Sequence, residues 1–268
     1  MAQRIDGRGR ELWRRSLRMP RALALEDSLV FVGDENELVL LRLSDGAQVA
    51  QYRFDRGILG VAVRGREVFV AHEHDGPGTV VAYELSGDAQ TRLLRQYEET
   101  FAFPRGIHVG EDSTLLVADT FGHRVVTLSV FTGERLWAAP SFFPNSVHLS
   151  GSGIVVTAEH LDAVVLMSPE NGSVLGVLAG CVRADVHRDP ALDPVREMGS
   201  RGLPGCSGEA QLGERDLRSP NDAVVDGEML YVADTDHHRV VAFRAGRWVG
   251  DIGGFNSPVS LRSVPRGR

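Results

Sequence analysis

The sequence predicts an all-β fold, a β-propeller in which small four-stranded sheets pack side by side around a central axis. Three observations predict it. A strand-like segment recurs about every 40 residues, and a Pro or Gly precedes a short apolar strand before each copy. No window shows a sustained apolar period of 3.6 residues, which argues against a helical solenoid. A sheet of this size has two apolar faces and buries both only between neighbours, so the units must pack radially.

The recurring segments are apolar and end in a small residue, often followed by Asp or His. They are 31–34, 69–72, 116–119, 155–158 and 231–234. Successive copies are 38, 47, 39 and 76 residues apart. The last step is two repeats long, yet the stretch before 217 lacks a strand pattern. We therefore predict an insertion at 181–216 in place of a repeat.

The other strands of each unit have their own markers. The innermost strand starts near a Pro or Gly, at 20–23, 57–60, 104–107, 144–147, 220–223 and 258–261. An alternating third strand follows the recurring segment, as at 124–128 and 239–243. A tight turn such as Thr132-Gly133 then leads into a fourth strand, because Gly supplies the positive φ that such turns need.

These markers divide the chain, taken as one domain over 1–268, into five complete blades. The blades are 19–55, 56–100, 101–140, 141–180 and 217–254. The chain ends supply part of a sixth, in which 255–264 is the innermost strand and 7–18 the outermost. This closing blade would lack its second and third strands. An open ring, a reduced blade and completion by other sequence all stay open, and exposed strand edges tend to pair with another chain.

Composition excludes several classes of protein. The chain is 43% hydrophobic and 24% charged, unlike disordered, collagen-like or disulfide-dense chains. Its apolar runs are too short for a membrane span. The net charge of −7 argues against nucleic-acid binding, although all basic residues are Arg. No signal peptide is evident, which favours a cytoplasmic location and free thiols at Cys181 and Cys206, with a disulfide as the alternative.

One segment carries a resemblance to a known family. Residues 231–243 form an apolar strand ending in Ala-Asp, a turn with His-Arg and a β-branched strand, which resembles an NHL repeat. Residues 117–126 match almost as well. His237 and Gly122 replace the family's turn Asn, and the other three units lack the His-Arg pair. The resemblance covers most of 19–264 and implies an NHL-type propeller of about six blades.

The Asp and Arg of this motif have a structural explanation. An Asp at a strand end accepts hydrogen bonds from backbone N–H groups of a turn, and the Arg can pair with it. We therefore interpret Asp119 with Arg124, and Asp234 with Arg239, as pairs that fix turns rather than as catalytic groups.

Polar residues follow the markers of the innermost strands, which line the channel of a propeller. These candidates for a ligand site at the channel mouth are Arg21, Arg56, Arg105, Asn145, Asn221 and Asp222. The arginines suit an anion. The amide and carboxylate oxygens suit a hard cation such as Ca²⁺. Strand-start capping is the structural alternative.

His108 and His148 occupy the same position in adjacent innermost strands. Histidine is a common metal ligand and general base. The resemblance adds a precedent, because NHL-like propellers include a peptide-amidating lyase with zinc-binding His residues on its inner strands. Ala24, Leu59 and Val224 stand at the aligned positions of other blades, so a zinc site lacks a third ligand.

These observations favour a non-enzymatic scaffold, without a cofactor, that binds a protein, peptide or other ligand on one face of the disc. Loops from every blade would form that face. The alternative is a metal-dependent enzyme, amidating-lyase-like or lactonase-like, with one Ca²⁺ or Zn²⁺ ion at the channel mouth. A third hypothesis, RNA binding through the arginines, conflicts with the acidic net charge. The ligand and the oligomeric state stay open.

Overall fold

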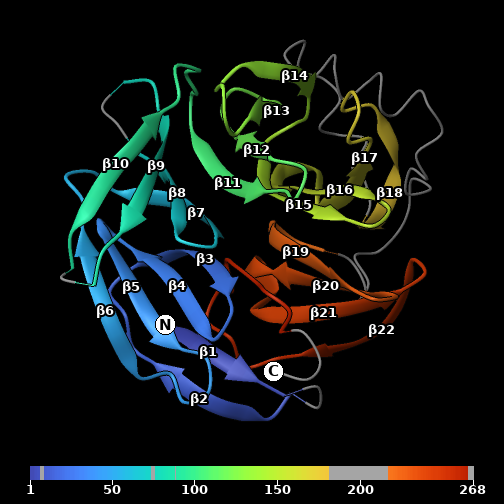
Figure 1. Cartoon of the computed structure of the whole chain (residues 1–268). Coiled ribbons are helices and arrows are strands. Elements are labelled where there is room, and N and C mark those ends of the chain that lie inside the picture. The colour runs from blue at the N-terminus through green and yellow to red at the C-terminus, as the bar shows by residue number, and fades with distance from the viewer. Residues whose placement is uncertain (7–8, 74–75, 88, 181–216, 265–268) are drawn as a thin grey trace.

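A computed structural model describes residues 1–6, 9–73, 76–87, 89–180 and 217–264 (Figure 1). Five antiparallel four-stranded sheets stand around a central axis, and in each the strands follow the chain order. The prediction of an all-β propeller is therefore confirmed. The predicted insertion at 181–216, with Cys181 and Cys206, lies outside the described residues.

The strands of the five blades start at the axis and end at the rim (Figure 1). Blade 1 is β3 (Pro20–Glu26), β4 (Leu29–Asp34), β5 (Glu37–Arg42) and β6 (Gln48–Arg53). Blade 2 is β7 (Ile58–Arg64), β8 (Glu67–His72), β9 (Thr79–Leu85) and β10 (Thr91–Gln96). Blade 3 is β11 (Pro104–Val109), β12 (Thr114–Asp119), β13 (Arg124–Ser129) and β14 (Arg135–Pro140). Blade 4 is β15 (Pro144–Ser150), β16 (Gly153–Ala158), β17 (Ala163–Met167) and β18 (Val174–Gly180). Blade 5 is β19 (Pro220–Asp226), β20 (Met229–Asp234), β21 (Arg239–Arg244) and β22 (Arg247–Ile252).

The core lies between blades rather than within them. In β12, Leu115 and Val117 pack toward blade 2, while Leu116 and Ala118 pack toward blade 4. Successive side chains of a strand point to opposite faces. Because both faces of the middle strands are buried, these strands are continuous apolar runs instead of alternating apolar and polar residues.

The prediction of about six blades is not met at the place where the two chain ends come together, which we call the sixth position of the ring. Residues 255–264 form no strand, and the hairpin β1 (Ala2–Ile5) and β2 (Glu11–Arg15) makes a separate two-stranded sheet. The structure thus has five four-stranded blades, and the sequence analysis missed β1. A single innermost segment cannot form a ladder without a second strand beside it to take its backbone hydrogen bonds.

The hairpin holds the place of third and fourth strands in the ring. The Nε1–H of Trp13 on β2 donates to the carbonyl of Leu43 in blade 1 at 2.8 Å. The fourth-strand Trp137 makes the same bond to Pro169 in the next blade at 2.9 Å. The Trp13 indole packs on the turn glycine Gly46, and the Trp137 indole packs on Gly172. Both contacts are close, because a Cβ added to either glycine would lie 2.6 Å from a ring carbon atom. β2 is therefore equivalent to β14.

The C-terminal segment holds the place of an innermost strand. The Thr235 hydroxyl donates to the Pro258 carbonyl at 2.7 Å, as the Thr120 hydroxyl donates to Pro144 at 2.8 Å. The Nδ1 atom of His238 accepts the Ser257 N–H at 3.1 Å, and His123 accepts the N–H of the residue before Pro144 at 3.4 Å. The His of the His-Arg turn thus binds one blade to the next.

We expect Trp13→Phe to lower the free energy of unfolding by about 1 kcal/mol, the net value of one hydrogen bond. Trp137→Phe, which removes the equivalent bond between complete blades, should have a similar effect. Urea unfolding followed by circular dichroism measures both. If Trp13→Phe is neutral while Trp137→Phe is destabilising, the hairpin does not hold blade 1 as described.

Candidate functional site

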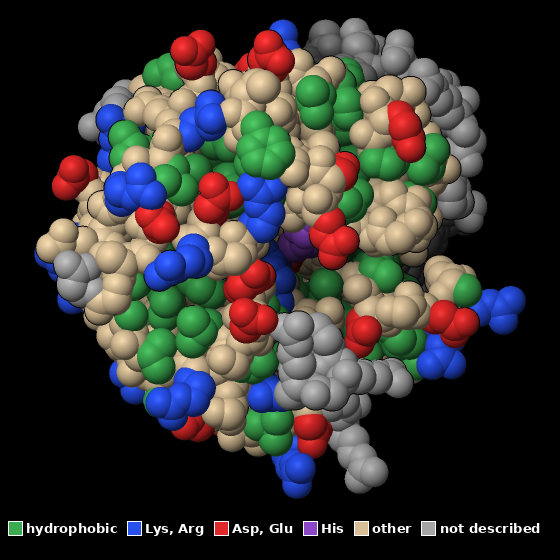
Figure 2. Space-filling view, viewed as in Figure 1, with side chains coloured by type: hydrophobic (Ala, Val, Ile, Leu, Met, Phe, Trp, Pro, Cys, Tyr) green, Lys and Arg blue, Asp and Glu red, His purple; other side chains and the backbone are tan. Residues whose placement is uncertain are grey.

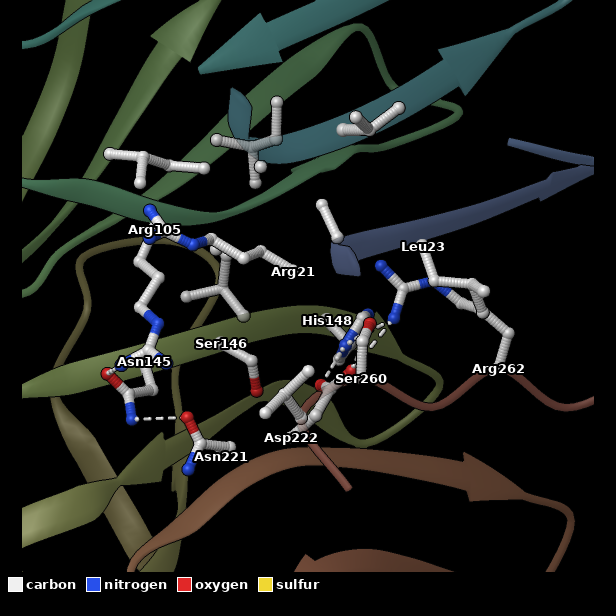
Figure 3. A pocket seen from close by; sticks show the side chains of 18 residues that line it. Arg21, Leu23, Arg105, Asn145, Ser146, His148, Asn221, Asp222, Ser260 and Arg262 are labelled. Carbon is white, nitrogen blue, oxygen red and sulfur yellow. Dashed lines mark hydrogen bonds and ion pairs between the residues drawn. The ribbon is translucent and has the colours of Figure 1, made fainter. Parts of the chain in front are cut away.

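The innermost strands surround a polar hollow on the propeller axis (Figure 3). Its volume is about 360 Å³, counting the part that is open to solvent. Every blade contributes, and so does the C-terminal segment. Five of the six predicted mouth residues line it. These are Arg21, Arg105, Asn145, Asn221 and Asp222.

A β-bulge at the second residue of each innermost strand aims these side chains. In blade 3, Pro104 pairs with Asp119 and Gly106 pairs with Ala118, so Arg105 has no cross-strand partner. The same register shift occurs in the other four complete blades. Such bulges redirect a side chain away from the ladder. The unpaired residues of the five strands are Arg21, Leu59, Arg105, Asn145 and Asn221.

The register corrects the prediction for blade 2. Ile58 pairs with His72 as Pro104 pairs with Asp119, so Leu59 holds the mouth position of that blade. Arg56 is exposed and does not line the hollow. The innermost strand of blade 2 begins with Ile instead of Pro, so the nearby Gly57 gave a misaligned marker.

The mouth residues form a connected network. The Arg105 Nη1 donates to the Asn145 Oδ1 at 3.1 Å and lies 3.4 Å from the Glu159 carboxylate. The Asn145 Nδ2 donates to Glu159 at 2.5 Å and to the Asn221 Oδ1 at 3.2 Å (Figure 3). Glu159 belongs to η1 (Glu159–Leu161), and the sequence analysis did not find it because it lies outside the innermost strands.

The arginines at the mouth are already paired with carboxylates. Arg21 lies 3.2 Å from Glu73, and Arg105 pairs with Glu159. The mouth therefore presents a balanced set of positive charges, negative charges and amides. This arrangement favours a ligand with its own donors and acceptors over a simple anion.

Asp222 lies deeper, where it holds several groups together (Figure 3). Its Oδ1 is 2.7 Å from the His148 Nε2, and its Oδ2 is 3.0 Å from the Arg262 Nη1. Its Oδ2 also accepts the Leu261 N–H at 2.7 Å and the Ser260 hydroxyl at 3.1 Å. Burial alone would raise the pKa of Asp222, but the charges of His148 and Arg262 and these hydrogen bonds hold it well below its usual range.

Arg262 and Ser260 are site residues that the sequence analysis missed. Arg262 follows Pro258 by four residues, as His148 follows Pro144 and His108 follows Pro104. This shared offset was a usable signal, because all three side chains belong to the same position of an innermost strand.

His108 and His148 lie side by side in the channel, with ring centroids 5.8 Å apart. Burial lowers the pKa of His108 to about 3, and the charges of His148 and Arg262 add to the shift. The equivalent residue in blade 2 is Ala62 rather than Leu59. Across the described ranges, no three His, Cys, Asp or Glu side chains are arranged to hold a metal ion.

The two Asp–Arg pairs lie outside the hollow. Arg124 Nε is 2.9 Å from Asp119, and Arg239 Nε is 2.7 Å from Asp234. The Asp119 carboxylate also accepts the Ala102 and Phe103 N–H groups just before β11. The Asp therefore anchors the segment that leads into the innermost strand of its own blade.

Next to the mouth lies an aromatic patch, which we define as Phe103, Phe121, Phe143 and His160. The Phe103 and Phe121 rings are 4.8 Å apart, and His160 stacks on Phe143 at 4.0 Å. Phe121 is 57% exposed. His160 adjoins Glu159 of the mouth network, so the patch and the network are continuous. Figure 2 shows this face, where apolar, acidic and basic side chains gather around the central hollow.

Comparisons with known proteins identify the family. The family described as "Outer membrane protein assembly factor BamB" (PQQ_2) matches residues 2–147. The chain belongs to this BamB family. The match supports a propeller, without placing the BamB-family chain specifically among NHL repeats. No helix among the described residues is long and apolar enough to cross a membrane.

Solved structures support the fold of this BamB-family propeller. A chain of a nidogen/laminin complex is 17% identical with a TM-score of 0.63, and the alignment covers 91% of this chain and 84% of that one. A protein of unknown function from Bacteroides caccae is 12% identical with a TM-score of 0.60, over 88% of this chain and 81% of that one. Among curated proteins, no significant match is found.

Proposed function

We propose that this BamB-family propeller is a non-enzymatic, NHL-type scaffold that binds a protein or peptide on the face of the channel mouth. The observation that carries the proposal is the continuity of the aromatic patch with the mouth network. Phe121 presents exposed apolar surface, and Arg105, Asn145 and Glu159 present donors and acceptors beside it.

The chemistry of this surface fits a polypeptide ligand. Protein interfaces concentrate their binding energy in aromatic and Arg side chains inside a polar rim. Phe121 lies in the turn between Asp119 and Arg124, which are paired at 2.9 Å. The NHL-like motif thus holds the Phe121 side chain in place before a ligand binds. Less conformational entropy of this turn is then lost on binding.

The descriptions of the matched family and of one structurally similar protein support a protein ligand. The matched family is described as an assembly factor for outer membrane proteins. One similar solved chain comes from a complex of nidogen with laminin. Both concern association between proteins, which agrees with the chemistry of the mouth face.

Phe121→Ser tests the proposal, with Phe131→Ser as the matched control. Phe131 is in the same blade and is 64% exposed, but it follows β13 and so lies at the opposite end of the sheet. Peptides selected from a random library on the wild-type protein should bind Phe121→Ser at least about tenfold more weakly, as expected for a hot spot. Calorimetry should show unchanged affinity for Phe131→Ser. Equal effects of the two substitutions would contradict the proposal.

His108 and His148, with ring centroids 5.8 Å apart, are the observation behind a second candidate, the metal-dependent enzyme. Zinc and calcium titrations distinguish the two functions. A scaffold should bind no stoichiometric metal ion, and His108→Gln should leave the metal titration unchanged. Binding of one equivalent of metal that is lost in His108→Gln would favour the enzyme.

A further inference from the structure

Among the described residues, no segment holds the place of a second strand at the sixth position of the ring. β1 and β2 hold the places of third and fourth strands, and 257–264 holds the place of the first. In the complete blades, a second strand pairs with both of its neighbours. Within the described part of the chain, β1 pairs with β2 alone, and 257–264 belongs to no sheet.

The described residues cover one face of blade 5 less completely than the same face of blade 3. Leu230 and Val232 of β20 pack toward blade 4, so the alternating Tyr231 points toward the sixth position. Tyr231 and its cross-strand partner Ala242 are only partly buried. Their equivalents in blade 3, Leu116 and Thr127, are each 2% exposed because blade 4 covers them.

The opposite side of the gap is already closed. Val30 and Val32 of blade 1 pack with Ala2 of β1 and with Val264. They are 3% and 1% exposed. The place of the second strand therefore adjoins the inner edge of β1 and the less covered face of blade 5.

Charge around the hairpin is strongly basic. The described residues before β3 include five arginines and only two acids, Asp6 and Glu11. The arginines are Arg4, Arg10, Arg14, Arg15 and Arg18. Arg18 also pairs with Glu35 of blade 1 at 3.5 Å. A complementary ligand carries carboxylates.

We infer that an extended, acidic segment of a partner protein adds to the inner edge of β1 as the second strand of the sixth blade. Backbone N–H and C=O groups on an unpaired strand edge are a template for such addition. Apolar side chains on one face of the added strand would cover Tyr231 and Ala242. Carboxylates at its ends would meet the basic hairpin. This surface is separate from the mouth face.

The test uses a peptide copy of residues 227–235, which span β20 and include Glu228 and Asp234 but no basic residue. Added to the full-length protein, it should bind at least tenfold more tightly than a scrambled peptide and than a copy with Val232→Pro, which lacks one backbone N–H. A copy with Glu228→Lys and Asp234→Lys should also bind at least tenfold more weakly. Hydrogen exchange should slow at the amides of Ala2–Ile5 on binding.

Several results would overturn the inference. These are no binding, equal binding of the scrambled peptide, and protection confined to residues outside β1. A fourth would be a peptide that binds a chain shortened after Val264 but does not bind the 268-residue chain. In that case the chain's own C-terminal residues would occupy the place of the second strand. Apart from this truncation, the readout is hydrogen exchange in the unmodified protein, so no substituted variant has to fold.

Discussion

Asp222→Asn should lower the free energy of unfolding by about 3–5 kcal/mol, the usual cost of removing one partner from a buried ion pair. The Asp222 side chain is 3% exposed and the Arg262 side chain 18%. The substitution leaves the Arg262 guanidinium without a counter-charge, and it weakens the contacts that hold the C-terminal segment to β19. Urea unfolding followed by circular dichroism measures the change.

Asp226→Asn is the matched control, because Asp226 lies on the same strand and is only partly buried. Its effect should stay within about 0.5 kcal/mol. The double variant Asp222→Asn, Arg262→Gln should regain part of the loss, since the unpaired buried charge is removed. Equal destabilisation by the two Asp→Asn variants, or a double variant less stable than the sum of its parts, would contradict the assigned role.

The protein should lose stability as the pH falls from 6.5 toward 4. Burial lowers the pKa of His72 to about 4, and burial with nearby positive charge lowers that of His108 to about 3. In the unfolded chain both have a pKa of about 6.5. Below that pH the unfolded state binds protons that the folded state does not, so stability is complete above 6.5 and declines as the pH falls. At pH 5 the loss is on the order of 2 kcal/mol for each side chain.

His72→Gln and His108→Gln should each flatten the pH dependence of the free energy of unfolding. His160→Gln is the control for the His→Gln replacement itself, because His160 is exposed. Urea unfolding at several pH values between 4 and 7.5 provides the measurement. A profile that stays equally steep in both of the first two variants would refute the assignment to buried neutral histidines.

His72 also shows where a local interpretation fails. It is followed in the sequence by Glu73, His74 and Asp75, and such a polar run by itself suggests a solvated loop. In the structure it ends β8 and is 3% exposed, with its Nε2 atom 3.2 Å from the Tyr83 hydroxyl. It holds the place that Asp119 holds in blade 3, so the repeat alignment was the better guide to its environment.

The repeat, the propeller class and the short-range pairs follow from the amino-acid sequence alone. Asp119 and Arg124 are five residues apart at facing ends of adjacent strands, so their contact follows from local geometry. The equivalence of His108 and His148 also followed from the repeat, since identical offsets in successive units place side chains at one level of the channel.

The tertiary structure alone shows which of the residues on the axis contact one another. Asp222 and Arg262 are 40 residues apart, and their contact exists only because the C-terminal segment closes the ring. The mouth position of blade 2 leaves no clear mark in the sequence, because β7 begins with Ile58 instead of Pro, and β1 is too short to show a pattern. These features depend on how the two chain ends and the five sheets pack together, and packing between distant segments has no local periodicity to reveal it.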